Sequence, residues 1–241
     1  VDYGCGAAHL TFALHHVLAD VCGDAAARSV GVDRLGHLVS RHRAAARALG
    51  YAMEFRESSI AAATTPAAAA RDGGAPLDFA VALHACDTAT DDALAAALAR
   101  GARHIIAAPC CHQELQRELK RVARGGGARR LPATAAPEDG DGAPPALSLH
   151  ARDNLILQRL GDTITDQLRA AILRLLGYRV DVVEFVELAH SPKNLLLRAA
   201  RRADAAPGAA DAALRLEYEA TKAAWQVTPH LENLLVARCH A

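Results

Sequence analysis

The stretch that decides the fold is Val1-Asp2-Tyr3-Gly4-Cys5-Gly6, at the start of the 241-residue chain. Two glycines separated by one residue let the backbone approach a ligand where a Cβ would collide. An acidic residue then closes the segment Ser29-Val30-Gly31-Val32-Asp33. A carboxylate at the end of a second strand can accept hydrogen bonds from both hydroxyls of a ribose. We therefore expect a nucleotide-type cofactor to be bound by Asp2, Gly4, Gly6 and Asp33.

Short apolar runs alternate with helical patterns after this turn. Strands are expected over residues 1–3, 28–32, 51–55, 78–83, 103–107, 178–186 and 193–199. Helices are expected over 7–22, 36–49, 90–100 (with Thr90 as its N-cap), 111–123, 162–176 and 207–226. The alanine-rich stretch 61–76 is expected to form a helix followed by a loop. The last two strands read as a hairpin. This alternation predicts an α/β fold whose sheet is mostly parallel, with one antiparallel strand.

Chemistry-bearing residues follow the two strands expected over 78–83 and 103–107. The histidine of Leu83-His84-Ala85-Cys86-Asp87 is suited to a general base, because its unperturbed pKa lies near neutrality. Asp87 is suited to orienting a substrate donor; alternatively, it stabilises the start of the next helix through the helix dipole. Cys110 is a candidate nucleophile or part of a pocket floor. We therefore take His84, Asp87 and Cys110 as the catalytic candidates.

A metal site is a second possible use of these strand ends. His84, Cys86, Cys110, Cys111 and His112 would converge if the two strands are neighbours. However, the segment contains no C-x-x-C spacing, and adjacent cysteines rarely both bind one tetrahedral ion. The sequence therefore predicts no metal.

Two further segments bear on ligands. Glu57 and Ser58 follow the third expected strand, where an adenine would be recognised, although Glu57 is equally compatible with a solvated acid. A basic stretch runs from Arg117 to Arg130 and is suited to a phosphate backbone, as in RNA. No aromatic residue is interleaved for base stacking, so a solvated helix face is the alternative.

Composition limits the class of protein. The formal net charge is zero, which argues against a protein that coats nucleic acid by bulk charge. No run of about 20 apolar residues predicts a membrane span. The six cysteines lie in apolar or strand-end contexts of a long chain, so we expect reduced thiols and a cytoplasmic location. Because Val1 falls inside the first expected strand, we expect the natural N-terminus to lie upstream.

The chain resembles known S-adenosylmethionine (SAM) methyltransferases. The Asp2-x-Gly4-x-Gly6 pattern looks like their motif I, without the third glycine of dinucleotide-binding folds. Longer segments resemble the methyltransferase-domain family that includes the ribosomal RNA adenine dimethylase domain-containing protein and its bacterial relatives. These segments are DYGCGAAHLTFALH, VGVD, LHACDTATDDALA, APCCHQEL, TITDQLRAAILRLLGYRVDVVEFV and HSPKNLLLRA. A more distant likeness is to tRNA ribose 2′-O-methyltransferases, in which glycine stands at the position of Asp87.

The resemblance implies a Rossmann-like class I methyltransferase fold: a seven-stranded sheet of order 3-2-1-4-5-7-6, its last strand antiparallel, with helices on both faces. It implies SAM as cofactor, a methyltransferase domain over residues 1–200 with a mobile loop at 124–146, and a helical tail over 201–241. The catalytic motif of N6-adenine enzymes is absent at Ala108-Pro109-Cys110-Cys111. RNA is the preferred substrate; protein, a small molecule, a non-catalytic binding module and an NAD-dependent oxidoreductase are the alternatives.

Overall fold

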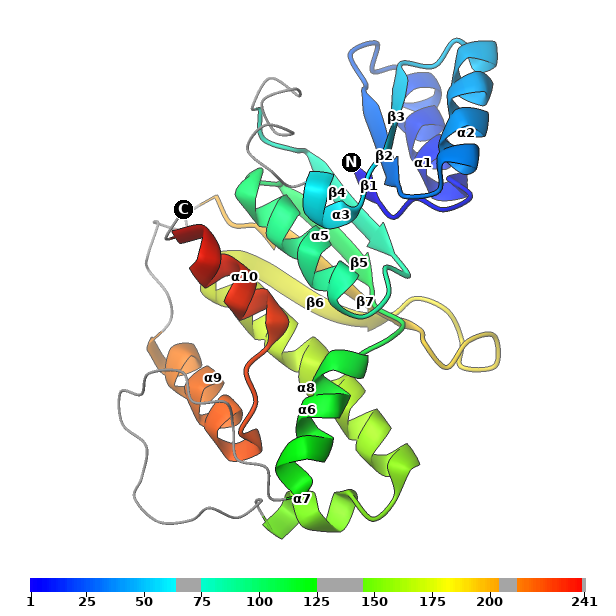
Figure 1. The fold of residues 1–241 in the computed structure, drawn as a ribbon. Coiled ribbons are helices and arrows are strands. Elements are labelled where there is room, and N and C mark those ends of the chain that lie inside the picture. Colours follow the sequence, from blue (N-terminus) through cyan, green and yellow to red (C-terminus); the bar gives the residue numbers. More distant parts are fainter. Residues whose placement is uncertain (64–74, 125–144, 204–211, 240–241) are drawn as a thin grey trace. The chain divides into compact units, whose positions relative to one another are not determined.

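The computed structural model describes residues 1–63, 75–124, 145–203 and 212–239. The chain forms two compact units: unit 1 comprises Val1–Cys110 and Arg179–Arg201, and unit 2 comprises Cys111–Tyr178 and Arg202–Ala241. Figure 1 labels the helices and strands on the ribbon. Most of the loop expected over 124–146 and most of the helix expected over 61–76 lie outside the described residues. Among the described helices, none is both long and apolar enough to cross a membrane.

Unit 1 contains a seven-stranded sheet of order β3-β2-β1-β4-β5-β7-β6. The pairs β1–β2, β2–β3, β1–β4 and β4–β5 are parallel, whereas β5 and β7 are antiparallel. This arrangement confirms the expected Rossmann-like methyltransferase fold. The strands are β1 (Asp2–Tyr3), β2 (Ser29–Asp33), β3 (Met53–Glu57), β4 (Phe79–Leu83), β5 (His104–Ala108), β6 (Tyr178–Glu184) and β7 (Leu195–Arg201).

Small side chains pack the centre of unit 1. The residues of β4 from Ala80 to Ala82 are buried, as expected for a continuous apolar run in a central parallel strand. Helix α5 (Thr88–Ala99) contributes a buried face of Leu94, Ala95 and Ala97. Because alanine is small and favours helix, an alanine-rich helix can lie close to the sheet without aromatic residues. The alanine-rich composition is therefore compatible with a packed core.

The helices next to the first strands differ in part from those expected. They are α1 (His9–His16), the π-helical segment η1 (Val17–Val21), α2 (Gly36–Leu49) and α3 (Ile60–Ala63). The helix expected over 7–22 is present, but its second half has π instead of α hydrogen bonding. Helix α2 ends as expected at Gly50, whose φ of 67° favours glycine. Val39 and Ala46 of α2 pack with Phe55 in a small core.

Unit 2 is helical in its described part. Its helices are α6 (Gln113–Ala123), α7 (Pro145–His150), α8 (Asn154–Leu175), α9 (Ala212–Trp225) and α10 (His230–Cys239). Helix α8 begins earlier than the expected 162–176, because Gly161 continues the helix instead of breaking it. A Cβ at Gly161 would lie 2.7 Å from Cγ of Gln116, so glycine allows α8 to approach α6 closely. Leu115, Leu119 and Leu168 are buried in this unit.

Candidate functional site

The glycine turn after β1 is fixed to the end of β2 by the backbone. Gly4 and Gly6 have φ angles of 74° and 51°, which residues other than glycine rarely adopt. The amides of Gly4 and Cys5 both donate to the carbonyl oxygen of Val32, at 2.8 and 3.0 Å. The Gly6 amide donates to Oδ2 of Asp33 at 2.8 Å. The turn and the acidic residue that sequence reasoning paired are therefore in direct contact.

The Asp33 carboxylate is held in one orientation. Its Oδ2 accepts the Gly6 amide, and its Oδ1 accepts the amide of Leu35 at 2.9 Å. A carboxylate oxygen has two lone pairs, so each oxygen keeps acceptor capacity after these bonds. Asp33 is only 9% exposed. Its remaining hydrogen bonds would therefore form away from bulk water, where a hydrogen bond is stronger.

Glu57 and Ser58 lie beside Asp33, at the position the sequence predicted. Glu57 is the register partner of Asp33 in the β2–β3 pair, and the Ser58 amide donates to the Asp33 carbonyl oxygen at 2.9 Å. The Glu57 carboxylate lies against Gly36: a Cβ there would be only 2.6 Å from Oε2. The structure thus gathers the predicted adenine-contacting residues next to the predicted ribose-binding residue.

Asp2 is a buried carboxylate behind the turn. It is 5% exposed, and Oγ1 of Thr11 donates to its Oδ2 at 2.6 Å. Burial raises the pKa of Asp2 and the nearby Asp33 charge adds to this rise, while the Thr11 hydrogen bond opposes it. A raised pKa means that the folded chain binds the Asp2 proton more tightly than the unfolded chain. The stability due to Asp2 is then present below the unfolded pKa, about 3.9, and is lost as the pH rises through the folded pKa.

Asp2→Asn is expected to stabilise the free protein, and increasingly so at higher pH. The amide removes the buried charge and still accepts the Thr11 hydroxyl through its oxygen. Thermal unfolding of both proteins should give a small difference in Tm at about pH 4 and a larger one at about pH 8. A difference that does not change with pH would contradict the assignment of Asp2 as a destabilising buried anion.

His42 is a site residue that sequence reasoning missed. It lies on α2, is 6% exposed, and its Nε2 is 2.8 Å from the carbonyl oxygen of Gly6. Because a carbonyl only accepts, Nε2 must carry the proton. Its ring also packs against Phe12 and Phe55 at centroid distances of 6.2 and 5.2 Å. The available sequence signal was its place on the buried face of α2, together with Val39 and Ala46.

The segment after β4 has a strained backbone. His84 and Asp87 have φ angles of 56° and 55°, unusual for residues other than glycine, and such strain clusters at functional sites. The His84 amide donates to the Ala108 carbonyl oxygen at 2.9 Å, and its side chain is exposed. The expected N-cap at Thr90 is wrong: Asp87 is the N-cap of α5, and the Thr90 hydroxyl donates to Ala85.

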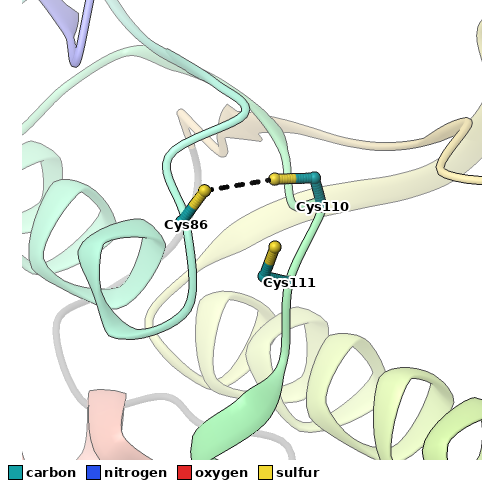
Figure 2. A group of neighbouring side chains, drawn as sticks. All are labelled: Cys86, Cys110 and Cys111. Atoms are coloured by element: carbon teal, nitrogen blue, oxygen red, sulfur yellow. Dashed lines mark hydrogen bonds between the residues drawn. The ribbon is translucent and has the colours of Figure 1, made fainter.

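Cysteines gather at the ends of β4 and β5. The sulfur atoms of Cys86 and Cys110 are 3.7 Å apart, and those of Cys86, Cys110 and Cys111 all lie within 4.8 Å of one another (Figure 2). Cys5 is different: burial, helped by Asp2 and Asp33, raises the pKa of its thiol to about 12. Since the thiolate is the reactive form, this raised pKa keeps Cys5 in the less reactive thiol form at neutral pH.

His112 lies in a buried polar group of unit 2 rather than among the cysteines. It is 3% exposed, with Nε2 2.9 Å from Oδ1 of Asp166 and Nδ1 3.0 Å from Oδ1 of Asp162. The second contact is an ion-pair distance whose angle does not suit a hydrogen bond. Burial alone would lower the pKa of His112, but the two aspartates outweigh it and the pKa is raised. Nη1 of Arg169 also contacts Asp166, at 3.1 Å.

A hollow in the described part of unit 1 lies at the other end of the strands, away from Asp33. It has a volume of about 1200 Å³ and is lined at the amino ends of the strands by Ser29, Met53, Phe79 and His104, among others. Open α/β sheets bind ligands outside the carboxyl ends of their strands. We therefore place the candidate site at the Asp33 edge and not in this hollow.

Residues 1–118 match the model of a family described as a methyltransferase domain. The match supports a methyltransferase family and a methyltransferase activity. The matched residues include the glycine turn, Asp33 and the strand ends at His84 and Cys110. No curated protein and no solved structure matches the chain.

Proposed function

We propose that the chain is a SAM-dependent methyltransferase. The observation that carries the proposal is the hydrogen bond from the Gly6 amide to Asp33, which joins the glycine turn of β1 to the acidic end of β2. The hydrogen bond holds the backbone of the turn beside the carboxylate that would accept the ribose hydroxyls. The matched methyltransferase domain gives the reaction class.

The residues at this edge fit the cofactor. An added Cβ at Gly6 would find its nearest atom, the Gly4 carbonyl oxygen, only at 4.0 Å, so there is space beside the turn. Asp33 keeps acceptor capacity that two ribose hydroxyls would use, and Glu57, its register partner on β3, would contact the adenine. When bound, SAM would supply an electrophilic methyl group on a sulfonium.

The strained segment after β4 would present the acceptor. His84 would remove or receive the acceptor proton, and Asp87 would orient a donor group of the substrate. Proximity and orientation supply most of the rate enhancement when a nucleophile is held in line with its target. Cys110, at the end of β5, is the third candidate to contact the acceptor.

RNA is the proposed substrate class. Its support is the distant likeness to RNA-modifying enzymes and the basic residues of α6, including Arg117, Lys120 and Arg121. Binding through phosphate contacts should weaken steeply as salt is raised. Protein and small-molecule acceptors are the competing substrate classes.

Two experiments test the proposal. Calorimetry should detect one SAM site per chain and no site for NADH. Incubation with tritiated SAM and separated RNA, protein and small-molecule pools should then place the label in RNA. If the protein binds SAM but the label appears in protein or small molecules, it is a methyltransferase whose substrate is not RNA. If it binds SAM and no pool is labelled, it is a non-catalytic module.

His42→Ala is expected to weaken SAM binding about 2- to 10-fold, because one hydrogen bond that fixes the turn is worth about 0.5–1.5 kcal/mol. His42→Gln keeps an N–H donor and should restore most of the affinity. His37, an exposed histidine on the same helix, provides the matched control as His37→Ala. Equal affinities for the Ala and Gln variants of residue 42 would show that the hydrogen bond does not position the turn.

A further inference from the structure

The cysteine cluster after β4 and β5 consists of Cys86, Cys110 and Cys111, and the proposed reaction gives no role to Cys86 or Cys111. Leu83 and Ala108 are register partners in these parallel strands, so the segments that follow them leave the sheet at the same edge. Cys86 and Cys110 lie on these two segments, and their sulfur atoms are 3.7 Å apart. Cys111 follows Cys110 directly, so covalent geometry keeps the third thiol close to the pair.

The spacing of the sulfur atoms suits a shared metal ion. A disulfide needs about 2.05 Å between the sulfur atoms, far less than the observed separation. Two thiolates on one tetrahedral zinc ion, each bonded at about 2.3 Å, lie about 3.8 Å apart. The distance between Cys86 and Cys110 is close to this value, and the third sulfur lies within 4.8 Å of both.

The ligand set selects a soft metal. Among the described residues, this cluster contains thiols and no carboxylate or imidazole. Thiolates favour Zn²⁺ or Cu⁺ over Mg²⁺ and Ca²⁺, which prefer oxygen ligands. Cys86 is exposed and Cys110 is partly exposed, so an ion has access from solvent.

We propose that Cys86, Cys110 and Cys111 bind one zinc ion. Binding would convert three thiols to thiolates and release three protons, and it would leave a fourth coordination position for water or a substrate atom. The sequence predicted no metal because the chain lacks a C-x-x-C spacing. The pairing of β4 with β5 brings the thiol of Cys86 next to those of Cys110 and Cys111, which a C-x-x-C spacing would otherwise do.

Metal titration of the whole chain tests the proposal. Protein that has been reduced and freed of metal is titrated with Zn²⁺ in competition with a chromogenic chelator, and separately with Co²⁺, whose thiolate complexes absorb in the near ultraviolet. We expect one ion per chain and a cobalt–thiolate absorption band. Cys86→Ser and Cys110→Ser should each weaken zinc binding at least about tenfold, the smallest loss typical of altered metal sites.

Cys22→Ser is the matched control, because Cys22 is an exposed thiol outside the cluster, and its zinc affinity should equal that of the unchanged protein. Circular dichroism verifies that each variant is folded. Absence of zinc uptake by the folded, reduced protein would overturn the proposal, as would uptake unaffected by Cys86→Ser. The titration needs no SAM, so its failure is distinguishable from failure of the proposed reaction.

Discussion

Asp33→Ala is expected to weaken SAM binding about 100-fold or more. Two ribose hydroxyls that donate to a charged carboxylate would contribute about 1.5–3 kcal/mol each, and 1.4 kcal/mol corresponds to a tenfold change in affinity. The substitution also removes the acceptor for the amides of Gly6 and Leu35, so the turn itself loses its anchor. Calorimetry with SAM, followed by a competition assay for weak binding, measures the change.

Asp24→Ala is the control for this prediction. Asp24 is an exposed acid before β2 that accepts the amide of Ala26, and its removal should leave the affinity unchanged. Asp33→Asn should lie between the two, because one side-chain oxygen acceptor remains. An Asp33→Ala protein that is folded and binds SAM within about threefold of the original, a difference smaller than one hydrogen bond to a charged group, would remove Asp33 from the site.

Arg169→Ala is expected to lower the free energy of unfolding of unit 2 by about 3–5 kcal/mol, the cost of breaking a buried ion pair. Arg169 is 1% exposed and contacts Asp166, which also contacts His112. With Asp162, this group holds two acids and two bases, so loss of the guanidinium leaves a buried negative charge without compensation. Urea unfolding followed by fluorescence of Trp225, the single tryptophan of the chain and part of α9, reports on this unit.

Arg159→Ala provides the comparison on the same helix. Arg159 is exposed on α8, so its removal should change the free energy of unfolding by less than about 0.5 kcal/mol. Equal unfolding midpoints for the Arg169 and Arg159 variants would show that the buried group contributes nothing to the stability of unit 2.

The strands and the pairing of the glycine turn with Asp33 could be predicted because their signals are local. The glycine turn, the acid at the end of β2 and the apolar run of β4 can each be recognised within a few consecutive residues. The order of the strands came from the resemblance to known methyltransferases. Contacts between distant residues lack such a signal. His42 reaches Gly6 across 36 residues, and His112 reaches Asp166 across 54.

Some predictions from local sequence failed because a contact with another part of the chain determined the conformation. The helix expected to begin at residue 162 begins at Asn154, and within it the missing Cβ of Gly161 makes room for Gln116. Thr90 was predicted to cap the helix because its hydroxyl can accept a hydrogen bond from a backbone amide. In the structure, the hydroxyl donates a hydrogen bond to the carbonyl oxygen of Ala85. In both cases the packing partner, which sequence alone does not reveal, decided the conformation.

A crystal structure of the chain with S-adenosylhomocysteine is the most direct test of the central claim. It is predicted to place both ribose hydroxyls within about 2.5–3.2 Å of the Asp33 carboxylate oxygens, the range of a hydrogen bond, with the backbone of Gly4 and Gly6 against the ligand. A nucleoside bound elsewhere, such as in the hollow lined by Ser29 and Met53 at the other end of the strands, would contradict the account.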